Sequence, residues 1–169
     1  MRRSVKITIM SVFITLCLIT VTAGNICSEE YSTLKGLKSV KAVFDFGLGN
    51  PQGALISLQV IQQTFKDKNM WVSGKKPEIA VIFVGPSVKL VSKSRSGFKE
   101  EDQKTLDEIA MKITEMAKDG IKFEICRIAM KILGVEPSSI LPEIKPVGNG
   151  WISLIGHESK GYSLVPVSP

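Results

Sequence analysis

One residue that can do chemistry stands where a predicted strand meets a predicted helix. The segment from Lys122 to Val135 begins with five residues that alternate polar and apolar, as in a short strand. Apolar residues then return at helical spacing until Gly134. Cys126 lies at the junction, which in a parallel sheet is the carboxyl edge, where ligands bind. Because the free N–H groups of a helix start favour a thiolate over a thiol, we predict that Cys126 is the functional residue.

The alternative for Cys126 is that it is a small hydrophobe in the core, as free cysteines often are. Arg127, which follows it directly, is a candidate to stabilise the thiolate. These two interpretations predict opposite positions for the sulfur atom: at the rim of the sheet, or enclosed by aliphatic side chains.

A second group of candidate binding residues follows the first predicted strand. Asp45 interrupts an apolar run, so it either orients a ligand or pairs with a backbone donor. Gly47 and Asn50 belong to a glycine-rich loop before a helix, which would suit a small anion. The glycine spacing does not match the dinucleotide fingerprint and no Lys-Ser/Thr pair follows, so a plain turn is the simpler interpretation.

Basic residues follow the second predicted strand, which ends near Gly85. The stretch from Lys89 to Lys99 carries four positive charges and no acid. Since it follows a strand at the same edge as Cys126, Gly85 and Lys89 are candidates to bind an anionic substrate such as a sulfur oxyanion. A solvated loop is the alternative.

No residue pattern predicts a metal or a cofactor. His157 is the only histidine, and it is either a general base or a surface residue of a short terminal helix. Met111, Met116 and Met130 recur at core-facing helical spacing and indicate packing. The chain contains no HExxH motif and no Ser-His-Asp or paired-carboxylate arrangement.

Strands and helices alternate along the chain. Predicted strands cover residues 39–46, 78–84 and 122–126, a short edge strand near Ile144, and residues 162–167. Helical patterns lie between them, ending with a short one that begins at Trp151. This order predicts a mostly parallel sheet with helices on both faces, joined by right-handed crossovers.

The N-terminal segment has the features of a secretory signal. Three basic residues precede an uncharged apolar run, and small residues end it at Ala23. We therefore expect residues 1–23 to be a signal peptide, 24–37 a flexible tail and 38–169 the folded domain of an exported, periplasmic or extracytoplasmic protein. A retained membrane anchor is the alternative, because the uncharged stretch continues to Cys27.

Removal of residues 1–23 changes the charge and the cysteine content. It takes three of the 22 basic residues and none of the 16 acids, so the formal charge falls from +6 to +3. This mild excess does not indicate a nucleic-acid-binding protein. Cys27 and Cys126 remain, and a disulfide between them stays open because the sequence does not show whether their Cβ atoms approach.

Taken together, these segments resemble the DsrE/DsrF-like family. The matching parts are Val43 to Ile61, the second strand closing on Gly85 to Leu90, the strand-cysteine-helix Phe123 to Val135, and the end Gly161 to Leu164. The resemblance implies a three-layer α/β/α fold, flavodoxin-like and doubly wound, with about five mostly parallel strands. It also implies homo-oligomers, commonly trimers or hexamers, with the cysteine in a pocket near a subunit boundary.

The resemblance also carries a functional expectation. Cys126 corresponds to the cysteine with which sulfur-relay members of the family carry a persulfide. We therefore expect an exported sulfur-handling protein in which Cys126 accepts or relays sulfane sulfur or senses thiol redox state. Such a protein would be a sulfurtransferase-like carrier with a thiol or sulfur-carrier protein as partner. The alternative is a non-catalytic oligomeric module that binds a small anion or a protein partner.

Overall fold

The computed structural model describes residues 31–168, and these form alternating strands and helices. The predicted signal segment and Cys27 lie outside the described residues. The five strands are β1 (Lys41–Phe46), β2 (Glu78–Phe83), β3 (Lys122–Cys126), β4 (Ile144–Val147) and β5 (Ser163–Val167). The four α-helices are α1 (Pro51–Lys66), α2 (Gln103–Asp119), α3 (Arg127–Ile132) and α4 (Gly150–Ser159).

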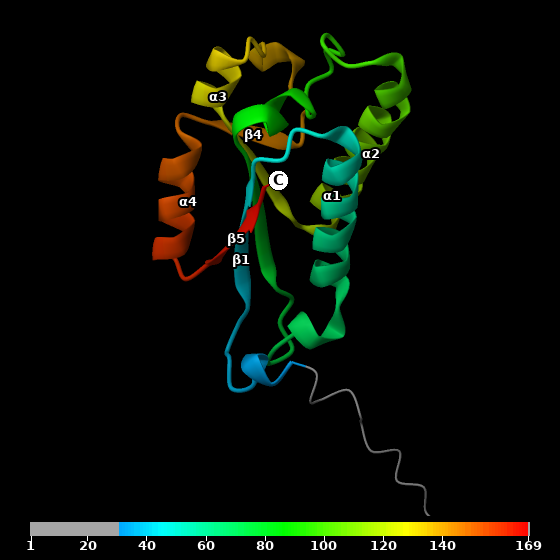
Figure 1. Cartoon of the computed structure of the whole chain (residues 1–169). Coiled ribbons are helices and arrows are strands. Elements are labelled where there is room, and N and C mark those ends of the chain that lie inside the picture. The colour runs from blue at the N-terminus through cyan, green and yellow to red at the C-terminus, as the bar shows by residue number, and fades with distance from the viewer. Residues whose placement is uncertain (1–30, 169) are drawn as a thin grey trace, which may run out of the picture. The chain divides into compact units, whose positions relative to one another are not determined.

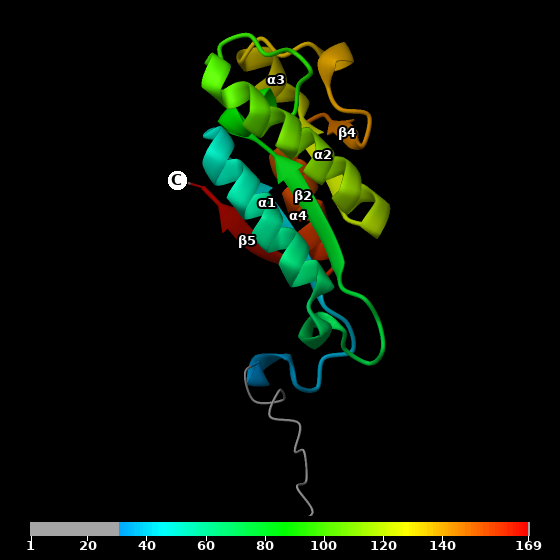
Figure 2. The same cartoon turned by 90° about the vertical axis from the view of Figure 1, so that its right-hand side faces the viewer.

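The strands form one all-parallel sheet in the order β4-β3-β2-β1-β5. The chain moves outward from β1 to β4 and returns once, from β4 past three strands to β5. Because parallel crossovers are right-handed, this single return places α4 on the opposite face from α1 and α2. Figure 1 shows α1 and α2 to the right of the sheet and α4 to its left, and Figure 2 shows α1 and α2 side by side in front of it.

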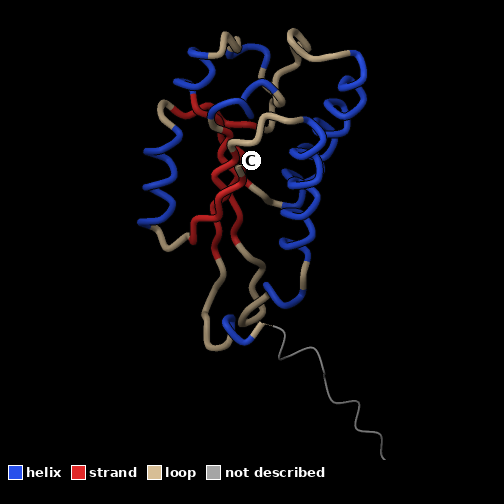
Figure 3. Tube along the Cα trace, in the orientation of Figure 1, coloured by secondary structure: helices blue, strands red, loops and turns tan. Residues whose placement is uncertain are grey.

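The predicted fold class is therefore confirmed: the fold is α/β, with helices on both faces of the sheet (Figure 3). The strand order differs from the flavodoxin order 2-1-3-4-5, in which the chain reverses after its first strands. Here the reversal comes only at the last crossover.

The main core lies between the sheet and the pair α1 and α2. Alternate strand residues such as Phe46, Phe83 and Phe123 point into it, as the period of two in a strand requires. Asn50 caps α1 by accepting a 2.8 Å hydrogen bond from the Gly53 N–H, and a left-handed Gly120 ends α2. Local signals in the sequence thus set the ends of both helices.

The opposite face of the sheet has a thinner cover. Among residues 31–168, α4 is the helix that packs on it, and Leu154 is the one large side chain of α4 that is buried, against Val43, Ala80 and Ile82. The outer side of α4 exposes Trp151, Ile152 and Ile155. The helix is therefore apolar on both sides.

Both edge strands contain a proline: Pro146 in β4 and Pro166 in β5. The Gly47 N–H donates a 2.9 Å hydrogen bond to the Val167 carbonyl, so Val167 turns its backbone groups toward β1. Because successive residues of a strand alternate, Pro166 turns outward, where its missing N–H leaves a gap in the edge. The prolines therefore disfavour extension of the sheet by another strand.

One packing prediction was wrong. Met111 is 64% exposed on α2, whereas Met116 and Met130 are buried as expected. Met111 lies two residues after Ile109, which turns it away from the face formed by Ile109, Ile113 and Met116. Within residues 31–168, no helix has the length and apolar character needed to cross a membrane, and no group of three or more potential ligands is placed to hold a metal ion.

Candidate functional site

Cys126 is the last residue of β3 and the N-cap residue of α3. It is a free thiol and is 7% exposed. The change from strand to helix happens directly at this residue, as the switch from alternating to helical spacing in the sequence predicts. The sulfur is thus largely covered yet lies at the carboxyl edge of the sheet.

The start of α4 closes over the cysteine from the other side. A Cβ atom built on Gly150 would lie 3.6 Å from Cys126 Sγ and only 2.8 Å from Val84 Cγ1. Gly150 is therefore the residue that lets the α4 backbone approach the thiol so closely. Asn149 fixes this end of α4 by accepting a 3.0 Å hydrogen bond from the Trp151 N–H.

The topology explains why two helices begin beside one sulfur atom. The connection after β3 runs along the α2 side, where Thr114 Oγ1 donates a 2.7 Å hydrogen bond to Glu143 Oε1. The connection after β4 runs along the opposite face through α4. Neighbouring strands whose connections leave to opposite faces open a crevice at their carboxyl ends, and this is where α/β proteins bind ligands.

Cys126 lines a cavity of about 350 Å³ in this crevice. Apart from Cys126, Gly85 and Asn149, its walls are apolar side chains contributed by the end of β2, by α3 and by α4, among them Ile132 and Trp151. Its lining contains no Asp, Glu, Lys, Arg or His. Cys126 thus lines a small apolar cavity and is at the same time part of the buried core.

The structure brings only part of the predicted site together. Gly85, with a left-handed φ of 51°, lines the cavity with Cys126. Arg127 is exposed and lines a different depression beside Met130. Gly47 and Asn50 are engaged in the backbone bond to Val167 and in the cap of α1.

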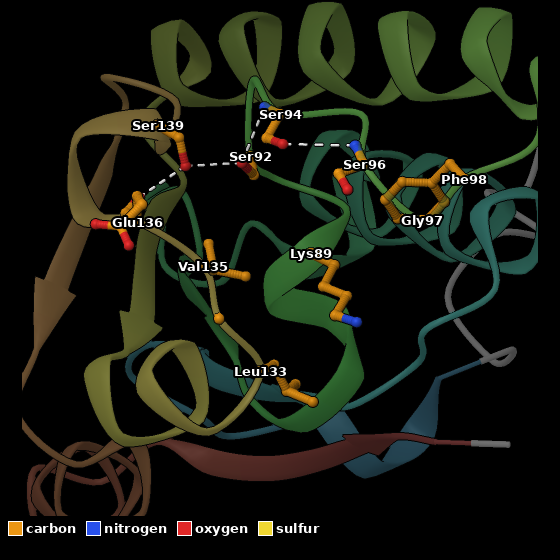
Figure 4. Close-up of a pocket in the computed structure, with 11 residues that line it drawn as sticks. Lys89, Ser92, Ser94, Ser96, Gly97, Phe98, Leu133, Val135, Glu136 and Ser139 are labelled. Carbon is orange, nitrogen blue, oxygen red and sulfur yellow. Dashed lines mark hydrogen bonds between the residues drawn. The ribbon is translucent and has the colours of Figure 1, made fainter.

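Lys89 lines a second cavity, of about 300 Å³, shown in Figure 4. Four serines also line this cavity, and a hydrogen bond of 2.7 Å joins Ser92 Oγ and Ser139 Oγ. Leu133 lines both cavities, so the two cavities are neighbours that share this residue. Lys89 and Cys126 therefore do not share one cavity, although both follow strands at the same edge.

Asp45 faces the α4 side of the sheet, in register with Ile82 of β2. Its Oδ1 atom is buried and has no hydrogen-bond partner. Burial raises the pKa of the Asp45 carboxyl above its ordinary value. Asp45 is thus a polar group without the backbone partner that a purely structural carboxylate would have.

A polar cluster beneath α4 is not evident from the sequence. Glu124 of β3 accepts a hydrogen bond from Ser153 Oγ and lies 3.8 Å from His157 Nε2. His157 also packs edge-on against Tyr162 and has a buried Nδ1 atom without a partner. The spacing of Ser153 and His157 on one helix face was the available signal, but Glu124 comes from a distant strand.

Comparisons with known proteins place this arrangement in a family. The chain is 24% identical over 128 residues to an uncharacterized protein of Aquifex aeolicus, covering 75% of this chain but 56% of that protein, so it spans little more than half of the relative's length. The solved structure of a protein of unknown function from Methanobacterium thermoautotrophicum has the same fold, with a TM-score of 0.60 at 12% identity, over 76% of this chain and all of that one. The ychN protein from E. coli matches with a TM-score of 0.49 at 7% identity, over 78% of this chain and 99% of that one. The model of the DsrE/DsrF-like family matches residues 39–167, and the chain belongs to that family.

Proposed function

We propose that this protein handles sulfane sulfur and that the thiol of Cys126 carries the transferred sulfur atom. The observation that carries the proposal is the position of the thiol, which lines a cavity at the point where the sheet's connections diverge. The other residues that line this cavity are mostly apolar, and Cys126 contributes the thiol that can carry a sulfur atom. Family membership supports the proposal, since some members handle sulfur.

The chemical step is a nucleophilic displacement. The Cys126 thiolate attacks the outer sulfur of a donor such as thiosulfate, a new S–S bond forms at Sγ, and the donor's S–S bond breaks. The electron pair of that bond leaves with sulfite, so Cys126 becomes a persulfide without any outside oxidant. The thiolate of an acceptor, such as a partner carrier protein, then attacks the outer sulfur of this persulfide. The S–S bond at Cys126 breaks, and its electron pair returns to Sγ of Cys126.

Cys126 lies beside the starts of two helices. It is the N-cap residue of α3, and a Cβ atom on Gly150, the first residue of α4, would lie 3.6 Å from its sulfur. A thiol in this position would also suit a sensor of thiol redox state.

Intact mass spectrometry tests the proposal. The protein incubated with polysulfide or thiosulfate should gain one sulfur, about 32 Da, and Cys126→Ser should not. Cys27→Ser is the matched control and should keep the gain. A Cys126 that gains no sulfur from any donor would favour the alternative function, a non-catalytic binding module.

We expect the protein to form homo-oligomers through a surface that we call the α3–α4 apolar face, composed of Ile128, Ile132, Trp151, Ile152 and Ile155. All five side chains are about half or more exposed. Contiguous exposed apolar surface of this kind marks an interaction site, and the edge prolines disfavour association through the sheet. The same face also supports the alternative, a module that binds a protein partner.

Native mass spectrometry at micromolar concentration tests the assembly. The wild-type protein should be a trimer or hexamer, and Ile155→Glu should shift it toward the monomer. Met111→Glu, a change of equal charge at an equally exposed residue of α2, should leave the assembly unchanged. A wild-type monomer would contradict the expectation.

We also propose that the protein is exported. The sequence supports this through the basic start and the apolar run that ends at Ala23. The mass of the protein recovered from its native cells should correspond to a chain that begins at Gly24. A full-length mass in the membrane fraction would indicate a retained anchor instead.

A further inference from the structure

We infer that the donor which loads Cys126 is an organic hydropersulfide, R–S–SH, whose R group is apolar. This inference rests on the proposed function and names its substrate class. It differs from the sulfur oxyanion that the basic stretch after β2 suggests.

The walls of the cavity beside Cys126 set this preference. Among the described residues that line this cavity, the side chains other than those of Cys126 and Asn149 are aliphatic or aromatic, and none is a cation. An oxyanion that entered this space would lose its water without gaining an ion pair, which is costly. An apolar R group instead gains by leaving water.

The two cationic residues that the sequence suggests for this site line other cavities. Lys89 lines the serine-rich cavity shown in Figure 4, which shares Leu133 with the cavity of Cys126. Arg127, although adjacent to Cys126 in sequence, lines a separate depression with Lys131. No described Lys or Arg therefore lines the cavity in which a donor would react.

The size of the cavity fits a small donor. Its volume of about 350 Å³ lies at the lower end of the range for small-molecule sites, roughly 300–1,000 Å³. Ile132 and Trp151 line it and also belong to the α3–α4 apolar face, so the surface next to the cavity is apolar as well. One aromatic ring or a short alkyl chain is the matching R group.

The loading step balances without a further reactant. The Cys126 thiolate attacks the outer sulfur of R–S–SH, and a bond forms between Sγ and that sulfur. The S–S bond of the donor breaks, and its electron pair leaves on R–S⁻. The proton stays on the transferred sulfur, so the products are the Cys126 persulfide and a thiolate.

The first experiment measures the preference of the cavity without sulfur transfer. Iodoacetamide and iodoacetate have nearly the same size, and only the second is charged. The quantity measured is the alkylation rate with iodoacetamide divided by the rate with iodoacetate. For Cys126 of the Cys27→Ser protein, this ratio should be about ten times that of N-acetylcysteine. A ratio equal to that of the free thiol would overturn the inference.

A charge placed at the rim provides the matched variant. Ile132→Lys should lower the ratio several-fold toward that of the free thiol, because it adds a cation to the cavity wall. Since Ile132 also belongs to the α3–α4 apolar face, the ratio is compared with that of Ile155→Glu, which changes the same face without lining the cavity. Met111→Lys adds the same charge at a residue of α2 that does not line this cavity, and it should not change the ratio. Equal ratios in Ile132→Lys and Met111→Lys would count against the role of the lining.

The second experiment compares donors by intact mass. Benzyl hydropersulfide should load Cys126 about tenfold faster than the charged glutathione hydropersulfide or thiosulfate. Equal or faster loading by the charged donors would overturn the inference and leave the proposed function standing. If no donor loads Cys126, the proposed function fails and this inference fails with it, whatever the alkylation ratio.

Discussion

The close approach of α4 to Cys126 predicts opposite effects for two glycine substitutions in one helix. A Cβ atom at Gly150 would lie 2.8 Å from Val84 Cγ1 and 3.0 Å from Cys126 Cβ. A Cβ atom at Gly156 would have nothing within 4 Å. Neither glycine has a positive φ, so alanine can adopt both backbone conformations.

The magnitudes follow from two competing effects. Alanine in place of glycine within a helix stabilises by about 0.5–1 kcal/mol. Forcing an extra carbon into a packed site costs about 1–3 kcal/mol, and the atoms around Gly150 are attached close to the backbone, so they cannot swing away. Gly156→Ala should therefore raise the free energy of unfolding by about 0.5–1 kcal/mol, whereas Gly150→Ala should lower it by roughly 0.5–2 kcal/mol.

Urea denaturation of the two variants measures the difference, and alkylation of Cys126 reports on the site. In Gly150→Ala the start of α4 must shift away from the thiol, so the alkylation rate should change, whereas in Gly156→Ala it should stay at the wild-type value. If Gly150→Ala were as stable as Gly156→Ala and its thiol reacted as in the wild type, the packing of α4 against Cys126 would be refuted.

Three further predictions concern pH. Burial raises the pKa of Asp45, so ionisation of this carboxyl lowers the stability of the folded protein as pH rises above the ordinary pKa of 3.8. In urea denaturation, Asp45→Asn should therefore be more stable than the wild type at pH 7 and should lose that advantage near pH 3. Hydrogen bonds, first of all from Lys112, lower the pKa of Glu115 to about 2. Its contribution to the free energy of unfolding is therefore complete above the ordinary pKa of 4.5 and fades as pH falls toward 2. Glu115→Gln should remove this part of the acid dependence of stability, and added salt should weaken it. Burial and the 2.8 Å hydrogen bond to Glu78 raise the pKa of Tyr162 to about 12, so ultraviolet absorbance should show one phenol of the folded protein ionising near that pH, and a value near 10 would contradict the burial. Tyr162→Phe should remove this late titration and cost about 1 kcal/mol at pH 7.

The sequence was sufficient for the elements because their signals are local. The alternation before Cys126, the helical return of apolar residues after it and the stop at Gly134 together predict a strand-to-helix junction, and the structure has β3 end and α3 begin there. Asn50 followed by Pro51 likewise indicates the start of α1, because Asn is favoured at the N-cap and Pro at the first helical position.

The site was less accessible to sequence reasoning because it depends on contacts between distant segments. Gly150 has the same local appearance as any glycine of a loop, and only the fold shows that it adjoins Cys126 from 24 residues away. Lys89 was predicted to lie at the same sheet edge as Cys126, and it does follow a strand there. It nevertheless lines a different cavity, which shares Leu133 with the cavity of Cys126. A strand edge fixes which residues are near one another to within a turn, and side-chain packing decides which of them share a cavity.

The last crossover brings the start of a second helix next to Cys126. In a sheet that only moved outward from β1, every connection would lie on one face and the end of β3 would be covered from one side. The return through α4 requires that helix to begin next to the end of β4, which pairs with β3 so that Val147 is in register with Cys126. The thiol is thereby placed between two diverging connections, each starting with a helix, and Gly150 removes the one Cβ atom that would fill the gap. The reversal of the chain therefore determines where the cavity forms, and apolar residues of α3 and α4 make up much of its lining.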